Sequence, residues 1–432
     1  MINALGLLKQ RRFLPLFTTQ FLGAFNDNLF KTSMVLFATY AIFNDARMEA
    51  NFNALATGIG ILPFFLLSAL AGQLADSQDK AKIIRLVKTA EIGIMLVGAA
   101  GLVTARMGFT TLGIVLMLSA VLMLGVHSTF FGPIKYAILP QHLKECDVLG
   151  GTGLVEAGTY IAILMGTITA GVLARYSYWW SVAAFMIVAF AGFFAGRQVP
   201  PAPREGPPLA LNYNILTSSW RLIAATLHIP RLFLAICSIS FFWTIGAVLI
   251  IVFPPLVKNV LTADELVSSL AIAVFSVGVA IGSIVINTLL KGRISARYSP
   301  ASVIAMGAFV VLFSFECRSF VGAGSGQLYG WREFLAQPGA IAIMATLLAI
   351  AVTGGMFVVP LYAFLTTTVE KDQTARTVAA NNVVNSGAMT IGSAAVLGIT
   401  ALGVTPEDML FLVAAMCLFS AWLAQQLHRA CD

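Results

Sequence analysis

Twelve apolar runs divide this chain of 432 residues, and they constrain its fold more than any other feature. A run of about 20 such residues forms a helix that can cross the hydrocarbon core of a bilayer. None of the runs shows the ten-residue alternation of a membrane β-barrel. Because 59% of the residues are hydrophobic and only 10% charged, a soluble domain could not hide this surface. We therefore expect an all-α integral membrane protein with twelve transmembrane helices. The runs lie near 13–43, 52–75, 81–104, 109–133, 150–174, 178–197, 231–256, 266–290, 300–320, 340–368, 376–403 and 408–427.

The distribution of positive charge predicts the orientation. With the N-terminus in the cytoplasm, 19 of the 26 Lys and Arg residues lie on the cytoplasmic side and 6 on the other side, while Lys31 lies inside the first run. This asymmetry obeys the positive-inside rule, so we expect both termini in the cytoplasm. The five cysteines are scattered without paired spacing, which indicates neither a disulfide framework nor a metal site. We expect no cofactor and no nucleic-acid partner.

A proline-rich stretch that begins VPPAPREGPP at Val199 separates six runs from six. Polar, proline-rich sequence is typical of a linker. We predict an N-terminal six-helix bundle (1–197), a cytoplasmic linker with a short amphipathic helix (198–230) and a C-terminal six-helix bundle (231–432). The halves repeat weakly: FFGPIKYAIL at 130–139 matches FVVPLYAFL at 357–365, and GLVEAG at 153–158 matches NVVNSG at 382–387. Such repeats are typical of secondary transporters, whose substrate sites lie at the repeat interface.

A polar stretch in the middle of the first run is the strongest functional signal. It carries Asn26, Asp27, Asn28 and Lys31 within six positions. A charge at the bilayer centre costs about 2.5–3.5 kcal/mol on insertion scales, so such groups face a protein interior or a watery cavity. Asp27 and Lys31 are four apart and can meet on one helix face. Either they form a self-neutralised pair that only helps insertion, or, as we favour, the stretch lines a polar pathway.

The loop after the second run reads GQLADSQDKAK and begins at Gly72. Gly72 permits close helix approach, and Asp76 can pair with a cation or with a helix N-terminus. The pattern, which continues through Lys80 and Lys82, resembles the signature of the major facilitator superfamily. We predict that Asp76, with Lys80 or Lys82, latches the cytoplasmic side of the outward-open state.

More narrowly, FNDN, GQLADS, GPIKYAIL and GLVEAG resemble the motifs of bacterial lysophospholipid transporters. The resemblance spans the whole chain and implies a flippase that carries lysophospholipid across the bacterial inner membrane to the cytoplasmic leaflet, without proton coupling. It further implies that Asp27, Lys135 and Glu156 are functional, and that a cytoplasmic-side acyltransferase reacylates the product. We expect a monomer that is not an enzyme. His142 and Asp147 fit the H-x4-D pattern of acyltransferases, but their short connection leaves no room for an enzyme fold.

Further candidates lie in other runs. Lys135 is near a helix end, where an anchoring role is the competing interpretation, whereas Glu156 is too deep for a surface acid. Glu91 can form an ion pair with Lys88 on the same helix. The eleventh run adds three asparagines that supply either substrate contacts or packing between helices: Asn381, Asn382 and Asn385.

One departure from the family pattern concerns the seventh run. The related transporters carry an arginine there, facing the acid of the first helix, but residues 245–253 read IGAVLIIVF. We predict that Lys31 supplies the missing positive charge. Two other functions stay open: a proton-coupled transporter of small amphiphiles or drugs, and a membrane scaffold for an acyltransferase. Charges in mid-membrane argue against the scaffold, which does not need them.

Overall fold

The structure, a computed structural model, consists of helices and their connections. It describes residues 4–38, 42, 46–173, 176–204, 212, 214, 217–218, 220–221, 224, 228–322, 328–370, 372–402 and 404–431. Within these residues the only β-type pairing is an isolated bridge between Ala263 and Tyr329. Ten helices among the same residues are long and apolar enough to span a membrane. Two further long helices, of 24 and 28 residues, carry the polar sequences around Asp27 and Asn381.

The helices follow the twelve predicted runs closely. The first six are α1 (Leu14–Phe37), α2 (Ala46–Ser77), α3 (Lys80–Arg106), α4 (Thr110–Ala137), α6 (Glu145–Leu173) and α7 (Tyr178–Arg197). The second six are α9 (Pro230–Asn259), α10 (Glu265–Leu290), α11 (Ser299–Ser319), α13 (Ala340–Thr367), α14 (Thr374–Ala401) and α15 (Pro406–Cys431). Short helices precede or join them: η1 (Ala4–Lys9), α5 (Leu139–His142) and α12 (Trp331–Ala336).

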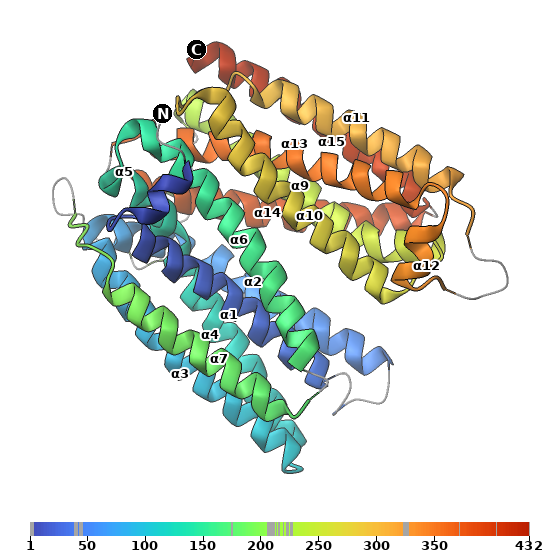
Figure 1. Cartoon of the computed structure of the whole chain (residues 1–432). Coiled ribbons are helices and arrows are strands. Elements are labelled where there is room, and N and C mark those ends of the chain that lie inside the picture. Colours follow the sequence, from blue (N-terminus) through green and yellow to red (C-terminus); the bar gives the residue numbers. More distant parts are fainter. Residues whose placement is uncertain are drawn as a thin grey trace.

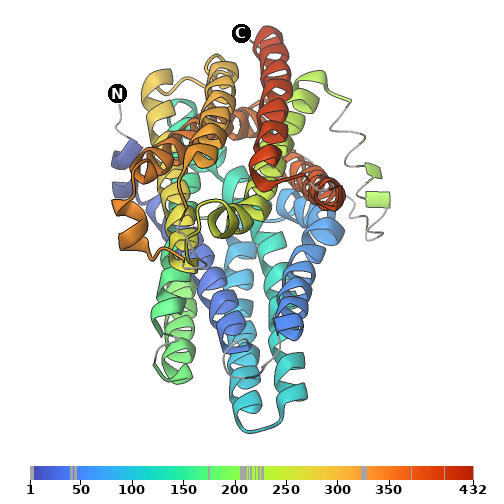
Figure 2. The ribbon, with the colours of Figure 1, turned by 90° about the vertical axis from the view of Figure 1, so that its right-hand side faces the viewer.

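The helices before the linker lie together at the lower left of Figure 1, and the later helices lie at the upper right. Both chain ends lie toward the same end of the molecule (Figures 1 and 2). The exact domain boundaries stay a prediction. About half of the predicted linker, including much of its amphipathic helix, lies outside the described residues.

Local sequence explains where several helices begin or bend. Pro15 occupies the first turn of α1, where no backbone N–H is needed. Asp79 caps α3 by accepting a hydrogen bond from the backbone N–H of Ala81 at 2.9 Å. Pro133 and Pro360 lie inside α4 and α13, so each removes one internal helix hydrogen bond at a matching place in the repeat.

Two glycines allow the two sets of helices to approach closely. A Cβ atom at Gly72 of α2 would lie 2.6 Å from the Ala379 Cβ of α14. A Cβ atom at Gly153 of α6 would lie 2.5 Å from the Ser283 carbonyl oxygen of α10. These contacts exclude larger side chains, because backbone atoms and short side chains cannot move aside.

Candidate functional site

Asp27 lies halfway along α1, against α4. Its Oδ2 accepts a hydrogen bond from the Ser128 hydroxyl at 2.7 Å. Its Oδ1 is buried and has no hydrogen-bond partner among the described residues. An ionised carboxylate can accept several hydrogen bonds. Asp27 is therefore held in place by one oxygen, while the other is enclosed in the protein without a hydrogen-bond donor among the described residues.

The neighbouring Asn26 points into a different environment, a buried charge cluster between α1, α3 and α4. Its Nδ2 donates to Glu91 Oε1 at 2.8 Å. Lys88 Nζ contacts Glu91 Oε2 at 2.6 Å, which confirms the predicted pair, and His127 Nε2 lies 3.4 Å from the same oxygen. Gly23 leaves room for the ammonium, since a Cβ there would lie 2.7 Å from Lys88 Nζ. Asn26, which belongs to the stretch predicted to line a polar pathway, is thus part of this buried cluster.

Lys31 and Asp27 do not form a pair, since no ion pair joins them in the described part of the chain. The two side chains have other surroundings: Asp27 bonds to Ser128, and Lys31 lines a hollow of about 470 Å³ with Met34 and Phe64. That hollow lies between the later turns of α1, the first half of α2 and α4. The self-neutralised pair is therefore wrong, and a role for Lys31 in place of the missing arginine stays a prediction.

Lys135 and Glu156 lie on the neighbouring helices α4 and α6. Glu156 is 2% exposed, and its carboxylate accepts a hydrogen bond from the Tyr136 hydroxyl. The Lys135 ammonium lies 4.7 Å from the centre of the Tyr136 ring, a cation–π distance. The charges of both Glu156 and Asp27 act on Lys135. The three predicted charges therefore share one electrostatic environment, with Tyr136 bonded directly to the acid.

The same tyrosine connects the two sets of helices. The Tyr136 ring of α4 stacks on the Tyr362 ring of α13, with centroids 4.8 Å apart and planes 12° from parallel. The Tyr362 hydroxyl accepts a hydrogen bond from Trp243 Nε1 at 2.8 Å, and Asn381 Nδ2 lies 3.5 Å from it. A chain of contacts thus runs from Glu156 across the interface to α9 and α14.

The remaining predicted asparagines differ in their surroundings. Asn385 is buried, and its Oδ1 accepts from the Ser240 hydroxyl at 2.6 Å. Asn382 faces α4, because a Cβ at Gly132 would lie 3.4 Å from its Nδ2. Asn28 donates to the Ala24 carbonyl oxygen of its own helix at 2.8 Å. Asn385 thus acts within the C-terminal helices, whereas Asn382 lies at the interface between the two sets.

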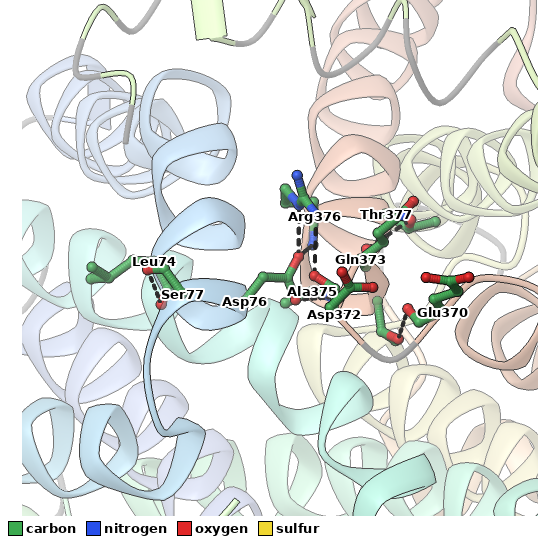
Figure 3. A network of polar contacts seen from close by, with 10 residues as sticks. Leu74, Asp76, Ser77, Glu370, Asp372, Gln373, Ala375, Arg376 and Thr377 are labelled. Carbon is green, nitrogen blue, oxygen red and sulfur yellow. Dashed lines mark hydrogen bonds and ion pairs between the residues drawn. The ribbon is translucent and has the colours of Figure 1, made fainter. Parts of the chain in front are cut away.

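Asp76 joins α2 to the beginning of α14, as Figure 3 shows. Its carboxylate accepts from the backbone N–H groups of Ala375 and Arg376 at 3.0 and 2.9 Å. Its Oδ2 also accepts from Arg376 Nε at 3.0 Å. An acid at a helix N-terminus is stabilised by unpaired N–H groups and by the helix dipole. The predicted latch thus has a different partner: Arg376, 300 residues away, takes the place assigned to Lys80 or Lys82.

The two lysines differ from each other. Lys80 is fully buried, and its charge acts on the Asp76 carboxylate. Lys82 is exposed and forms no ion pair with Asp76 in the described part of the chain. The latch therefore consists of Asp76, Arg376 and the first turn of α14, with Lys80 contributing through its charge.

Asp76→Asn should open this end of the molecule. The variant loses the charge that attracts Arg376 and the α14 N-terminus, a change worth about 1–2 kcal/mol, which shifts the ratio of states about five- to thirtyfold. The measurement is the alkylation rate of a cysteine placed at Asn382, close to the interface. Asp408→Asn is the matched control, because Asp408 pairs with Arg318 within the C-terminal helices. Equal alkylation rates in the two variants would contradict the latch.

The aromatic residues of the site were not among those predicted from the sequence. Tyr136 and Tyr362 follow the matched prolines in the repeated segments, so the repeat contained a signal for the pair. Their stacking depends on the packing of α4 against α13, which no local pattern reports. Ser128 and Arg376 were also missed, because a single hydroxyl or a cation at a helix start has no distinctive spacing.

Most of the chain matches one protein family. Residues 16–393 fit the family model described as Major Facilitator Superfamily. The chain belongs to this superfamily. The predicted all-α major facilitator fold and the multi-pass membrane character are thereby confirmed.

Individual relatives of this major facilitator chain are more specific. It is 26% identical over 363 residues to the lysophospholipid transporter LplT of Serratia proteamaculans, a match that covers 83% of this chain and 80% of that protein. It is 25% identical over 424 residues to LplT of Escherichia coli, a match that covers 95% of this chain and 94% of that protein. The predicted resemblance to bacterial lysophospholipid transporters is confirmed.

Among solved structures, a bacterial homologue of the iron transporter ferroportin in an outward-facing state superposes with a TM-score of 0.70 at 14% identity, covering 98% of this chain and 99% of the other. At that identity the likeness concerns the fold alone.

Proposed function

We propose that this protein carries lysophospholipids across the bacterial inner membrane to the cytoplasmic leaflet, where an acyltransferase can restore the second acyl chain. A lysophospholipid has a charged phosphate headgroup and a single acyl chain. Its carrier needs charged groups and an apolar surface in one continuous site. The observation that carries the proposal is the unequal polarity of the two sides of the interface.

One side of the interface is charged. Asp27, Lys135 and Glu156 all belong to the helices before the linker. The Oδ1 of Asp27, which has no partner among the described residues, suits an amine, and the Lys135 ammonium suits a phosphate. Together these charges fit a zwitterionic headgroup.

The other side offers an apolar pocket beside neutral polar groups such as Asn381 and Asn385. A pocket of about 220 Å³ lies mainly between α9, α10 and α13, where the missing arginine was expected. Its α9 wall consists of Phe242, Trp243, Ile245, Gly246, Ala247, Leu249 and Phe253. Burying a CH2 group is worth about 0.8 kcal/mol, so an acyl chain gains from entering this pocket. The loss of the arginine thus leaves an apolar wall suited to a lipid tail.

Two aromatic residues connect the pocket to the charged site. Tyr160 of α6 lines the pocket, and it lies close enough to Glu156 for the two groups to interact electrostatically. Trp243 also lines the pocket, and it donates to the Tyr362 hydroxyl in the stacked pair with Tyr136. A molecule with one polar end and one apolar chain can therefore bridge both regions.

We further propose alternating access without proton coupling. The Asp76–Arg376 contact closes one end of the interface, and rocking of the two sets of helices would break it and open that end. Glu156 has a hydroxyl donor and the charge of Lys135 nearby. These two groups oppose the effect of burial, which favours the neutral form of the acid. In this proposal, Glu156 keeps one protonation state throughout the transport cycle.

The test is uptake of labelled lysophospholipid into proteoliposomes, with and without a pH gradient. Uptake that equilibrates at the same rate in both conditions is the expected result. No uptake above that of protein-free liposomes would overturn the proposal. Uptake that follows the gradient would instead favour a proton-coupled carrier of amphiphiles, the alternative that the buried acids support.

Gly246→Leu should select against long acyl chains. A Cβ at Gly246 would meet no atom within 4 Å, so the leucine can enter the pocket without displacing its walls. It takes the room of about four carbons of a lipid tail, at ~0.8 kcal/mol per CH2. Four carbons correspond to about 3 kcal/mol, so we expect the apparent affinity for long-chain lysophospholipid to fall about a hundred- to two-hundredfold. A short-chain analogue should lose much less. Uptake assays with both lipids measure the difference.

Gly93→Leu is the matched control for this variant. Gly93 lies on α3, away from the pocket, and a Cβ there also meets no atom within 4 Å. We expect no change in chain-length preference. An equal loss of transport for short and long chains in Gly246→Leu would contradict the assignment of the pocket to the acyl chain.

A further inference from the structure

A hollow of about 660 Å³ lies where the beginning of α1 meets α3 and the end of α7. Four arginines line it, and none of its lining residues is acidic. The lining residues are Arg11, Arg12, Pro15, Arg85, Arg197, Gln198, Val199, Pro200 and Pro201. The transport site proposed above contains none of these residues.

The four guanidinium groups have little to balance their charge. Arg85 Nη2 donates to the Val199 carbonyl oxygen at 3.2 Å, and Arg197 lies 4.8 Å from the centre of the Phe193 ring. No carboxylate lies within ion-pair distance of these four arginines in the part of the chain that the structure describes. Like charges around one hollow repel one another, and an anion between them converts that repulsion into attraction.

The wall of the hollow is fixed by hydrogen bonds. Asp79 Oδ1 accepts from the Ala202 N–H at 3.0 Å, and the Lys80 N–H donates to the Ala202 carbonyl oxygen at 3.0 Å. On the other side, the His142 ring nitrogens lie 3.2 Å from the Arg12 carbonyl oxygen and 3.4 Å from that of Pro201. Burial lowers the pKa of His142, which disfavours the charged form of the ring. The segment 199–202 is therefore held in place and forms a fixed wall of the hollow.

The surroundings suit a lipid better than a free anion. Exposed apolar side chains lie within three residues of the lining residues in the sequence of all three helices: Leu14 on α1, Leu86 on α3 and Phe194 on α7. In a membrane protein such side chains face lipid. The positive-inside rule predicts that this arginine-rich end lies in the cytoplasm, where the leaflet is rich in anionic lipids.

We propose that this hollow binds the phosphate-bearing headgroup of an anionic phospholipid of the cytoplasmic leaflet, with its acyl chains along α3 and α7. Arginine forks recognise phosphate oxygens through paired N–H groups, which gives both strength and orientation. The site is independent of the proposed transport function, because it lies outside the interface between the two sets of helices.

The test compares the full-length protein with Arg12→Gln/Arg197→Gln in nanodiscs that contain phosphatidylglycerol and phosphatidylcholine. Native mass spectrometry of the released protein counts the phosphatidylglycerol molecules that remain bound. The control is Arg293→Gln/Arg297→Gln, which removes two exposed positive charges from the loop after α10 on the same predicted face. We expect the arginine-hollow variant to bind phosphatidylglycerol at least about tenfold more weakly, with the control unchanged.

Three outcomes would overturn the proposal. The two variants could lose phosphatidylglycerol equally, which would indicate only a general charge effect. Phosphatidylcholine could be retained as well as phosphatidylglycerol, which would exclude recognition of a net negative charge. Millimolar inorganic phosphate could displace the lipid completely, which would identify the ligand as a free anion. Because the readout is lipid retention, a failure here is distinct from a failure of the transport assay.

Discussion

Asp27→Asn is expected to leave a folded, membrane-inserted protein that has lost most of its transport. Asparagine keeps the size of the side chain and an oxygen for the Ser128 hydroxyl, 2.7 Å away in the native protein. It removes the negative charge at the oxygen that has no partner among the described residues. Hydrogen bonds to charged groups contribute about 1.5–3 kcal/mol, so the uptake rate should fall about ten- to hundredfold.

Ser128→Ala is the matched control for Asp27. It removes the one hydrogen bond that positions the carboxylate but keeps the charge. We expect a smaller loss of transport than in Asp27→Asn, because the negative charge stays in the site. If Asp27→Asn transports at the native rate, the carboxylate has no part in binding the substrate. If Asp27→Asn and Ser128→Ala lose equal fractions of the transport rate, the position of the Asp27 side chain matters and its charge does not.

Lys88→Ala should destabilise the protein more than any surface substitution. Lys88 and Glu91 are both completely buried, with Nζ and Oε2 2.6 Å apart. Without the lysine, the Glu91 carboxylate keeps Asn26 as a donor and His127 as a neighbour but loses its permanent cation. Breaking a buried ion pair from one side costs about 3–5 kcal/mol. The measurement is the free energy of unfolding in mixed detergent micelles.

Two comparisons make this second prediction specific. Arg318→Ala breaks an ion pair whose side chains are 40% and 46% exposed, so it should cost no more than about 1 kcal/mol. Lys88→Met combined with Glu91→Gln removes both charges and should recover most of the lost stability. Equal losses in Lys88→Ala and Arg318→Ala would show that the buried cluster is not an important source of stability.

The buried cluster and the transport site are linked through adjacent residues. Asn26 contacts Glu91 in the cluster, while Asp27 bonds to Ser128 at the candidate site. On α4, His127 likewise lies next to Glu91 in the cluster, whereas the adjacent Ser128 bonds to Asp27. The cluster therefore fixes α1 against α4, and this sets the position of the Asp27 carboxylate.

The sequence by itself determined the helices, because each span must be apolar over the thickness of a bilayer. The predicted run 178–197 coincides with α7, and 266–290 differs from α10 by one residue. It also determined which polar groups lie in membrane helices, since a charge there stands out against apolar neighbours. Asp27 and Glu156 stood out in this way, whereas Lys135 was singled out by the resemblance to lysophospholipid transporters. The apolar character of residues 245–253 was likewise visible in the sequence.

Only the tertiary structure decided which groups meet. Asp27 and Lys31 have suitable helical spacing, yet Asp27 bonds to Ser128, 101 residues away. Asp76 has two lysines close in sequence, yet its ion pair is with Arg376, 300 residues away. Helical spacing fixes the face on which a side chain lies, but the packing of helices decides what faces it. The same reason explains the stacked Tyr136 and Tyr362, because each tyrosine belongs to a different half and gains its partner only when α4 packs against α13.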